Sequence, residues 1–146
     1  MTSKKIPNFL NEYEIYDFVG KGAFSSVFNS YRNGNRYAMK RVNSEERFKK
    51  CAVNEINLLK DIDSKYIVKM VDNFMFNNIQ YLVFEHLYDN LYNFIVKKKN
   101  YPNFNTLLQF CYQMAEGLDY LHSNEIIHCD FKLENLMICH DLQNIK

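Results

Sequence analysis

The stretch Ile126-Ile-His-Cys-Asp-Phe-Lys-Leu-Glu-Asn-Leu-Met-Ile138 carries most of the chemistry that the chain offers. It places His128, Asp130, Lys132 and Asn135 within eight positions, between apolar flanks. An aspartate can orient a hydroxyl and accept its proton, a lysine can neutralise a phosphoryl group, and an asparagine oxygen can bind Mg²⁺. We interpret His128 as a structural hydrogen-bonding residue. The alternative for the whole stretch is an ordinary capped turn between a helix and a strand.

A glycine-rich turn, Val19-Gly-Lys-Gly-Ala-Phe-Ser-Ser-Val27, lies far upstream. Residues 14–19 and 26–31 on either side are rich in aromatic and β-branched residues, which indicates strands. Because the turn joins two strands, it is not a dinucleotide-binding turn, which leads from a strand into a helix. Gly20 and Gly22 would let the backbone approach a phosphate and adopt positive φ. An ordinary glycine hairpin is the alternative.

Lys40 and Glu55 are predicted to form an ion pair. Lys40 shares one face of the strand 36–42 with Ala38, where a buried ammonium needs an anion. Glu55 lies on the inward side of the following helix, where a carboxylate needs a cation. The apolar stripe of that helix is Phe48, Ala52, Ile56 and Leu59. Such a pair facing a glycine-rich turn can hold the α- and β-phosphates of a nucleotide. The alternative is an edge lysine that reaches water.

The two halves of the chain differ in their predicted secondary structure. The first half is expected to hold five strands and one helix that begins at Ser44. The strands are 14–19, 26–31, 36–42, 68–74 and 79–84, with tight turns at Asn33-Gly34 and Asn77-Asn78. The second half is helical. It comprises a short helix over 91–98, a longer helix capped by Thr106, and a short buried strand over 136–139, and the long helix has the apolar stripe Leu107, Phe110, Cys111, Met114, Leu118 and Leu121.

Composition excludes several classes of protein. With 47% hydrophobic residues the 146-residue chain can bury a core, and it is long enough for one domain or two small lobes. The net charge of +1, from 18 basic and 17 acidic residues, argues against a nucleic-acid surface or an anionic-membrane surface. No apolar run reaches the roughly 20 residues of a membrane span.

The start of the chain and its cysteines predict an intracellular protein, in the cytoplasm or the nucleus. Residues 1–7, Met-Thr-Ser-Lys-Lys-Ile-Pro, lack the apolar core of a signal peptide. Four cysteines lie far apart without a Cys-x-x-Cys pair, which favours reduced thiols over disulfides or a zinc site. They are Cys51, Cys111, Cys129 and Cys139.

In order and spacing, the glycine turn, Tyr37-Ala-Met-Lys40, Glu55 and the segment 128–135 together resemble a eukaryotic protein kinase. The resemblance covers about residues 13–146. A lysine two positions after Asp130 resembles serine/threonine kinases. The hinge-like Tyr81-Leu-Val-Phe-Glu-His-Leu87, followed by Asn90-Leu-Tyr92, resembles the CMGC group. With the cysteine of His-Cys-Asp, the chain looks most like the dual-specificity tyrosine-regulated kinases.

The resemblance implies an α+β, protein-kinase-like fold. Its N-lobe would have a five-stranded antiparallel sheet and one helix, followed by the first helices and the catalytic loop of an incomplete C-lobe. The implied division is an N-terminal extension over 1–12, the N-lobe over 13–85, a hinge over 86–90 and a partial C-lobe over 91–146. The implied activity is transfer of the ATP γ-phosphoryl group to the hydroxyl of a protein substrate, with ATP and Mg²⁺ and without nucleic acid or membrane.

The family's functional residues carry over by motif. Asp130, Lys132 and Asn135 would be catalytic, and Asn135 would also be a Mg²⁺ ligand. The implied ATP-binding residues are Val19, Gly20, Lys21, Gly22, Val27, Ala38, Lys40, Glu55, Phe84, Glu85, Leu87 and Asn90. Among them Val19, Val27 and Ala38 would cover the adenine. Phe84 would be the gatekeeper, Glu85 and Leu87 would offer backbone groups to adenine, and Asn90 would lie near the ribose.

Several positions depart from the family pattern. Ser25 stands at the third glycine and Leu133 at the usual proline. Cys129 replaces an arginine that receives an activation-loop phosphate in many kinases, so we expect no control by that contact. Lys146 precedes the place of the family's Asp-Phe-Gly motif, whose aspartate binds Mg²⁺, so we expect no more than trace activity from this chain alone.

Two functional hypotheses therefore stay open at this point. One is the N-terminal part of a serine/threonine kinase domain, either as a fragment or as a split product. The other is a catalytically dead remnant that binds nucleotide or acts as a scaffold. A third, an unrelated nucleotide-binding protein, requires the spacings of Lys40, Glu55, Asp130 and Asn135 all to be coincidental.

Overall fold

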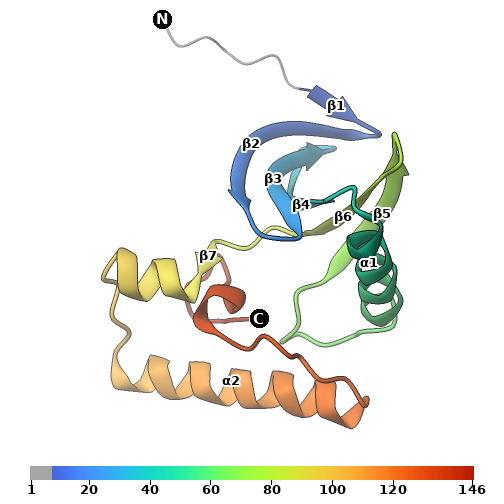
Figure 1. Cartoon of the computed structure of the whole chain (residues 1–146). Helices are drawn as coiled ribbons and strands as arrows, with labels where there is room; N and C mark the ends of the chain where they lie inside the picture. The colour runs from blue at the N-terminus through green and yellow to red at the C-terminus, as the bar shows by residue number, and fades with distance from the viewer. Residues whose placement is uncertain (1–7) are drawn as a thin grey trace, which may run out of the picture. The chain divides into compact units, whose positions relative to one another are not determined.

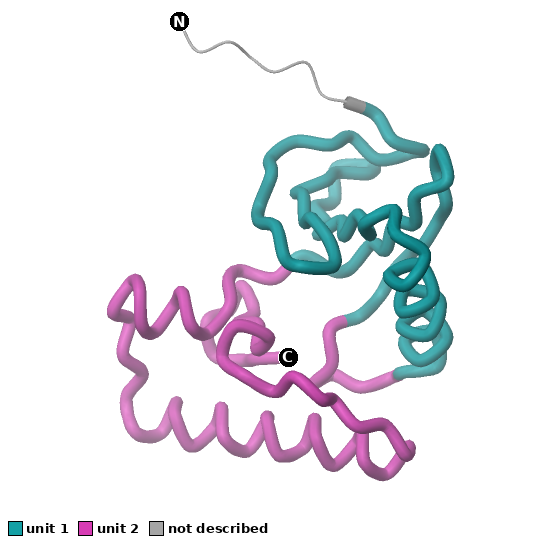
Figure 2. Tube along the Cα trace, in the orientation of Figure 1, with its two compact units in different colours: residues 1–62, 69–86 teal, residues 63–68, 87–146 magenta. Residues whose placement is uncertain are grey.

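The computed structural model describes residues 8–146 (Figure 1). It divides into two compact units, which Figure 2 colours separately. Unit 1 joins the residues through Ile62 with Lys69–His86, and unit 2 joins Asp63–Val68 with Leu87–Lys146. The elements of unit 1 are β1 (Asn8–Leu10), β2 (Tyr13–Lys21), β3 (Ser25–Arg32), β4 (Asn35–Val42), α1 (Glu46–Leu59), β5 (Met70–Phe76) and β6 (Ile79–Glu85). Those of unit 2 are β7 (Asp89–Asn90), the π-helix η1 (Tyr92–Lys97), α2 (Phe104–Ser123), the 3₁₀ turn η2 (Leu133–Asn135) and β8 (Met137–Ile138). Within this described part of the chain, no helix is long and apolar enough to cross a membrane.

Unit 1 is built on an antiparallel sheet with strand order β1-β2-β3-β4-β6-β5. The predicted sheet with one helix is confirmed, and β1 adds a sixth strand to the five that were expected. β1 falls in residues 1–12, which were expected to form only an extension. Asn11 has a φ of 56°, so the chain turns back sharply and Phe9 pairs with Glu14 of β2.

Both predicted tight turns form for the expected reason. Asn33 and Gly34 have φ values of 52° and 79°, and Asn77 and Asn78 have values of 48° and 60°. Two successive residues with positive φ make the turn whose twist matches the twist of the flanking strands. These turns set the registers of β3 against β4 and of β5 against β6.

The sheet of unit 1 has an apolar cluster on each face. On one face Met39 of β4 packs with Tyr13, Tyr81 and Val83. On the other face Val42 and Leu82 pack with Phe48 and Ala52 of α1. The predicted helix stripe therefore does face the sheet, on the same side as Lys40, because Lys40 lies two positions before Val42 and pairs with Leu82.

The predicted cap of α1 is wrong by one residue. The N-cap is Glu45 rather than Ser44, and its side chain makes no capping hydrogen bond. The backbone N–H groups of Phe48 and Lys49 both donate to the Glu45 carbonyl, at 3.0 and 3.2 Å. The first helical turn thus closes on Glu45, and the helix begins at Glu46.

The long helix α2 begins earlier than predicted. Its N-cap is Asn103, whose side-chain oxygen accepts a hydrogen bond from the backbone N–H of Thr106 at 2.9 Å. Thr106 therefore donates to the capping side chain and is not the cap itself. An asparagine at this position satisfies an otherwise unpaired N–H of the first turn.

The buried face of α2 also differs from the predicted stripe. Its buried residues are Phe110, Gln113, Gly117 and Leu121, whereas Leu107 and Cys111 are exposed. Gln113 is only 6% exposed because both ends of its amide are bonded. Its Nε2 donates to Asn144 Oδ1 at 2.6 Å, and its Oε1 accepts from the Ile145 backbone N–H at 2.8 Å.

The core of unit 2 forms where η1, α2 and the end of the chain meet. Leu91, Phe110, Leu136, Ile138 and Ile145 are its buried members. The short strand predicted over 136–139 appears as β8, which pairs with β7. The helix predicted over 91–98 appears as the π-helix η1, whose turn is closed at its C-terminal end by a bond from the Lys98 N–H to the Asn93 carbonyl at 2.8 Å.

Residues 63–68 group with unit 2, although the expected N-lobe covered 13–85. The backbone N–H of Asp63 donates to the hydroxyl of Tyr120 in α2 at 2.9 Å. Tyr66 lies against Gly117 of the same helix. These contacts attach the segment between α1 and β5 to α2.

Candidate active site

Lys40 and Glu55 form the predicted ion pair in unit 1. The Nζ of Lys40 lies 2.7 Å from each carboxylate oxygen of Glu55. β4 supplies the lysine and α1 supplies the glutamate from the middle of its length. The side chains are 26% and 35% exposed, so the pair is partly solvated and the ammonium stays accessible to a further anion.

Three further predicted residues share a face of the sheet with Lys40. Val27 of β3 is the cross-strand partner of Lys40, and Ala38 of β4 is the partner of Phe84 of β6. Ala38 and Lys40 are two positions apart, so both side chains lie on the same face. All three are half-buried. The fold thus places a small apolar surface beside the ammonium.

The glycine turn is open. Neither Gly20 nor Gly22 has a positive φ, so of the two properties that glycine allows, the turn uses close approach and not the left-handed conformation. A Cβ at Gly20 would meet no atom within 4 Å, and one at Gly22 would reach only the Ser25 carbonyl at 3.9 Å. The backbone is consequently uncovered from outside, as close approach of a phosphate requires. The exposed Val19 lies where the β2–β3 register shifts.

Asp130, Lys132 and Asn135 come together in unit 2. Lys132 Nζ lies 2.9 Å from Asp130 Oδ1. Asn135 Nδ2 donates to Asp130 Oδ2 and to the Asp130 backbone carbonyl, both at 2.8 Å. The turn η2 makes this possible, because the Asn135 N–H bonds to the Lys132 carbonyl at 2.9 Å.

The backbone before Asp130 has an unusual conformation. Cys129 has a φ of 63°, a region that non-glycine residues seldom adopt. The Asp130 N–H points back to His128, with the carbonyl at 2.9 Å and Nδ1 at 3.3 Å. His128 therefore acts as the predicted hydrogen-bonding residue. Strain of this kind is concentrated at functional sites.

The charged groups of this cluster shift each other's pKa values. Hydrogen bonds from Lys132 and then Asn135 lower the pKa of Asp130 below its ordinary value. The bond to Asp130 raises the pKa of Lys132. At neutral pH the carboxylate is ionised and the amine is charged. Asn135 uses its amide nitrogen on Asp130, so its side-chain oxygen is the atom that could serve as a ligand for a cation.

The hinge-like residues belong partly to each unit. Glu85 makes two hydrogen bonds with the backbone of Lys69. Its N–H donates to the Lys69 carbonyl at 3.0 Å, and its Oε1 accepts from the Lys69 N–H at 2.8 Å. Leu87 is buried in unit 2. Asn90, predicted near a ribose, uses its side-chain oxygen to accept from the Asn93 N–H at 2.8 Å, near the start of η1.

Comparison with known proteins identifies the family of this chain. The family model described as "Protein kinase domain" matches residues 13–146. The chain belongs to the protein kinase family. The match spans Lys40, Glu55, Asp130 and Asn135 together, so the residues in both units belong to one kinase domain.

Similar curated proteins narrow the relationship. The human "Dual specificity tyrosine-phosphorylation-regulated kinase 3" is 35% identical over 138 residues, which is 88% of this chain and 23% of that protein. The Drosophila melanogaster "Putative dual specificity tyrosine-phosphorylation-regulated kinase 3 homolog" is 36% identical over 136 residues, 86% of this chain and 16% of that protein. The Caenorhabditis elegans kinase mbk-2 is 35% identical over 136 residues, with the same two shares of 86% and 16%. This chain spans less than a quarter of the length of these relatives.

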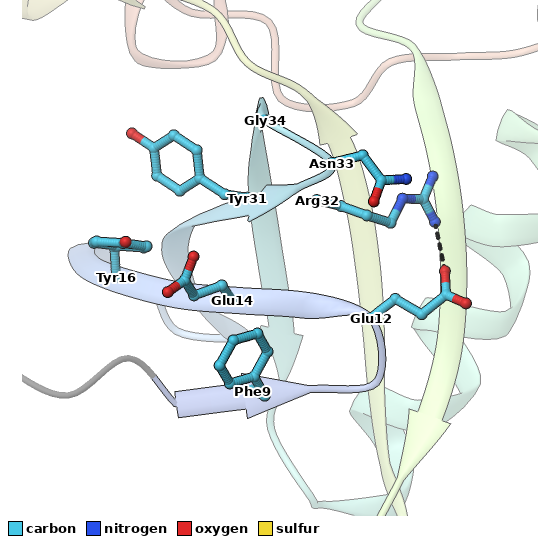
Figure 3. A pocket seen from close by; sticks show the side chains of 8 residues that line it. All are labelled: Phe9, Glu12, Glu14, Tyr16, Tyr31, Arg32, Asn33 and Gly34. Atoms are coloured by element: carbon cyan, nitrogen blue, oxygen red, sulfur yellow. Dashed lines mark ion pairs between the residues drawn. The ribbon is translucent and has the colours of Figure 1, made fainter.

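The kinase domain has a separate surface pocket at the opposite end of the β2–β3 hairpin from the glycine turn (Figure 3). Its volume is about 470 Å³, and its lining comes from β1, the turn that follows β1, β2, β3 and the Asn33–Gly34 turn. Arg32 lies 3.7 Å from Glu12 and 3.1 Å from Asp72, so its charge is already compensated. The lining contains none of the predicted ATP-binding residues.

Proposed function

We propose that this chain is the ATP-binding and catalytic-loop part of a protein kinase that transfers the ATP γ-phosphoryl group to protein hydroxyls. The observation that carries the proposal is the pairing of Lys40 with Glu55 on an accessible sheet face. The clustering of Asp130, Lys132 and Asn135 in unit 2 supports it. Membership of the protein kinase family links the two.

Unit 1 fits a nucleotide. Glu55 fixes the direction of the Lys40 ammonium, and this leaves a positive charge available for phosphate oxygens. The backbone at Gly20 carries no covering side chain, so a phosphate could approach it closely. Val27, Ala38 and Phe84 supply half-buried apolar atoms on the same face, which suits a flat base.

Unit 2 supplies the groups for transfer. The ionised Asp130 would accept a hydrogen bond from the acceptor hydroxyl and take its proton as the new oxygen–phosphorus bond forms. The bond to the bridging oxygen breaks at the same stage, and ADP leaves with the electron pair. Lys132 would compensate charge on the transferred group. Asn135 would hold Mg²⁺ through its side-chain oxygen, and the ion, when bound, neutralises phosphate charge.

The acceptor and the cellular location are also proposals. Lysine two positions after Asp130 supports serine and threonine as acceptors. The names of the similar kinases include dual specificity, so tyrosine is tested alongside serine and threonine. Four free cysteines support an intracellular location, in the cytoplasm or the nucleus.

ATP binding is tested on the 146-residue chain itself. Titration calorimetry with ATP and Mg²⁺ is expected to detect binding that weakens at least about tenfold in Lys40→Met, because a charge-assisted contact to phosphate is lost. Lys97→Met, which removes an exposed lysine at the end of η1, is the matched control and should bind normally. Equal binding by wild type and Lys40→Met would refute the assignment.

Transfer is tested in a chimaera that continues this chain with the rest of the human relative's kinase domain. Labelled ATP and peptides with serine, threonine or tyrosine serve as substrates. Asp130→Ala is expected to reduce turnover by several orders of magnitude while ATP binding persists. Retained turnover would remove Asp130 from the mechanism. ATP binding without turnover in the unmodified chimaera would favour the non-catalytic alternative.

A further inference from the structure

The tip of the glycine turn is tied to the junction between β4 and α1. Asn43 occupies this junction, directly after the last residue of β4. Its backbone N–H donates to the Phe24 carbonyl at 3.0 Å, and its side-chain Nδ2 donates to the Ala23 carbonyl at 2.9 Å. One asparagine therefore holds two consecutive carbonyls of the turn.

An aromatic contact holds the same tip from the side. Phe24 is 63% exposed, but its ring meets Phe48 edge to face, with centroids 5.2 Å apart and an interplanar angle of 73°. Phe48 is fixed in the core between α1 and the sheet, where it packs with Ala52 and Leu82. The guanidinium of Arg47 lies 4.4 Å from the Phe48 ring centroid, on the exposed side of the helix. The exposed tip thus rests on an anchored ring.

The turn has little packing of its own. Residues 21–24 are exposed, and a Cβ at Gly20 would touch nothing. Within the turn, the Gly22 N–H bonds to the Ser25 carbonyl at 2.8 Å. Exposed backbone with few apolar contacts opens at low free energy, so contacts from outside the turn decide how well it is ordered.

We propose that Asn43 and Phe24 are positioning residues that keep the glycine turn in its phosphate-binding conformation. The inference rests on the proposed function. The junction that carries Asn43 joins the strand of Lys40 to the helix of Glu55, so the same short segment aligns the turn, the ammonium and its carboxylate. None of the sequence motifs includes Asn43, whose partners lie 19 and 20 positions away in the chain.

The proposal separates phosphate binding from base binding. When the tip is released, ATP binds only the fraction of molecules whose turn is ordered, and the apparent affinity falls by that fraction. Adenosine has no phosphates, so its affinity does not depend on the order of residues 21–24 at the tip, because Val19 and Val27, which are expected to cover the adenine, lie in strands β2 and β3. A residue that merely stabilises the fold would change both affinities together. The ratio of the two affinities is therefore the informative quantity.

The experiment compares Asn43→Ala and Phe24→Leu with wild type in the 146-residue chain. Asn124→Ala is the matched control, because its Nδ2 also donates to a backbone carbonyl, that of Tyr120 at 2.8 Å, far from the turn in sequence. Amide ¹⁵N relaxation reports the order of residues 21–24, and calorimetry gives the affinities for ATP and adenosine. Asn43→Gln, which keeps an amide donor, tests rescue.

We expect Asn43→Ala to lower the order of the turn and to weaken ATP binding about fivefold, with adenosine binding unchanged. Phe24→Leu should act in the same direction, Asn43→Gln should recover part of the loss, and Asn124→Ala should match wild type. Unchanged relaxation, or equal losses for ATP and adenosine, would overturn the proposal. If wild type binds neither nucleotide, the proposed function fails, and the relaxation of Asn43→Ala alone decides whether Asn43 orders the turn.

Discussion

The Lys40–Glu55 pair is predicted to contribute little to stability and much to nucleotide binding. Two charges at 2.7 Å attract by about 6 kcal/mol at an effective dielectric constant of about 20. Most of this is offset by desolvation and by the loss of side-chain freedom, since the side chains keep 26% and 35% exposure. A net coupling of about 1 kcal/mol is therefore expected.

A double-mutant cycle measures this coupling. Lys40→Met, Glu55→Gln and the double variant are unfolded in urea, and the interaction energy is taken from the non-additivity of the free energies of unfolding. In the single variants the remaining charge is solvated through its exposed part, so each should lose no more than about 1–2 kcal/mol. ATP affinity should fall about 10- to 100-fold in Lys40→Met, which corresponds to about 1.4–2.8 kcal/mol.

The two measurements together separate a binding role from a structural role. A coupling above about 3 kcal/mol would show that the pair behaves as a buried structural bridge, against the observed exposure. A loss of ATP affinity no larger than the loss caused by Glu55→Gln would show that the lysine does not contact phosphate. Either result would refute the binding role assigned to the pair.

Three more predictions concern other parts of the chain. Lys132→Met should raise the pKa of Asp130 towards its ordinary value, because the bond from Lys132 is the largest cause of the lowering; in wild type the carboxylate should stay ionised to a lower pH, and carboxyl NMR titrations that coincide would contradict this. Tyr13→Phe should cost about 1–2 kcal/mol in urea unfolding, because the hydroxyl donates to the charged Asp72 at 2.9 Å, and a neutral effect would show that water replaces the bond. Phe110→Ala should cost about 3–5 kcal/mol, because the ring is 1% exposed in the core of unit 2, and a loss below about 1 kcal/mol would place that core elsewhere.

Local features of unit 1 could be predicted because their causes are local. Asn33-Gly34 and Asn77-Asn78 tolerate positive φ, and this property of two adjacent residues sets each turn. Period-two alternation placed Lys40 and Ala38 on one face, and helical spacing turned Glu55 towards that face. The ion pair follows because the partly buried Lys40 ammonium and Glu55 carboxylate each need an opposite charge nearby.

Other features depend on contacts between distant residues. β1 forms because a turn at Asn11 returns residues 8–10 to the edge of the sheet, and composition alone did not indicate a strand there. The buried face of α2 is rotated from its apolar stripe because Gln113 bonds to residues 144 and 145, more than 30 positions away. A polar residue becomes a core residue only when such partners exist.

From the amino-acid sequence alone, the residue types and spacings of Lys40, Glu55, Asp130 and Asn135 determined the family and the chemistry available to it. The tertiary structure alone decided how these groups are held. It showed Asn135 bonded to the Asp130 carboxylate, and Asn43 bonded to two carbonyls of the glycine turn. The physical reason is that side-chain type sets what an atom can donate, accept or neutralise, whereas hydrogen bonds form only where folding brings donor and acceptor within about 3 Å.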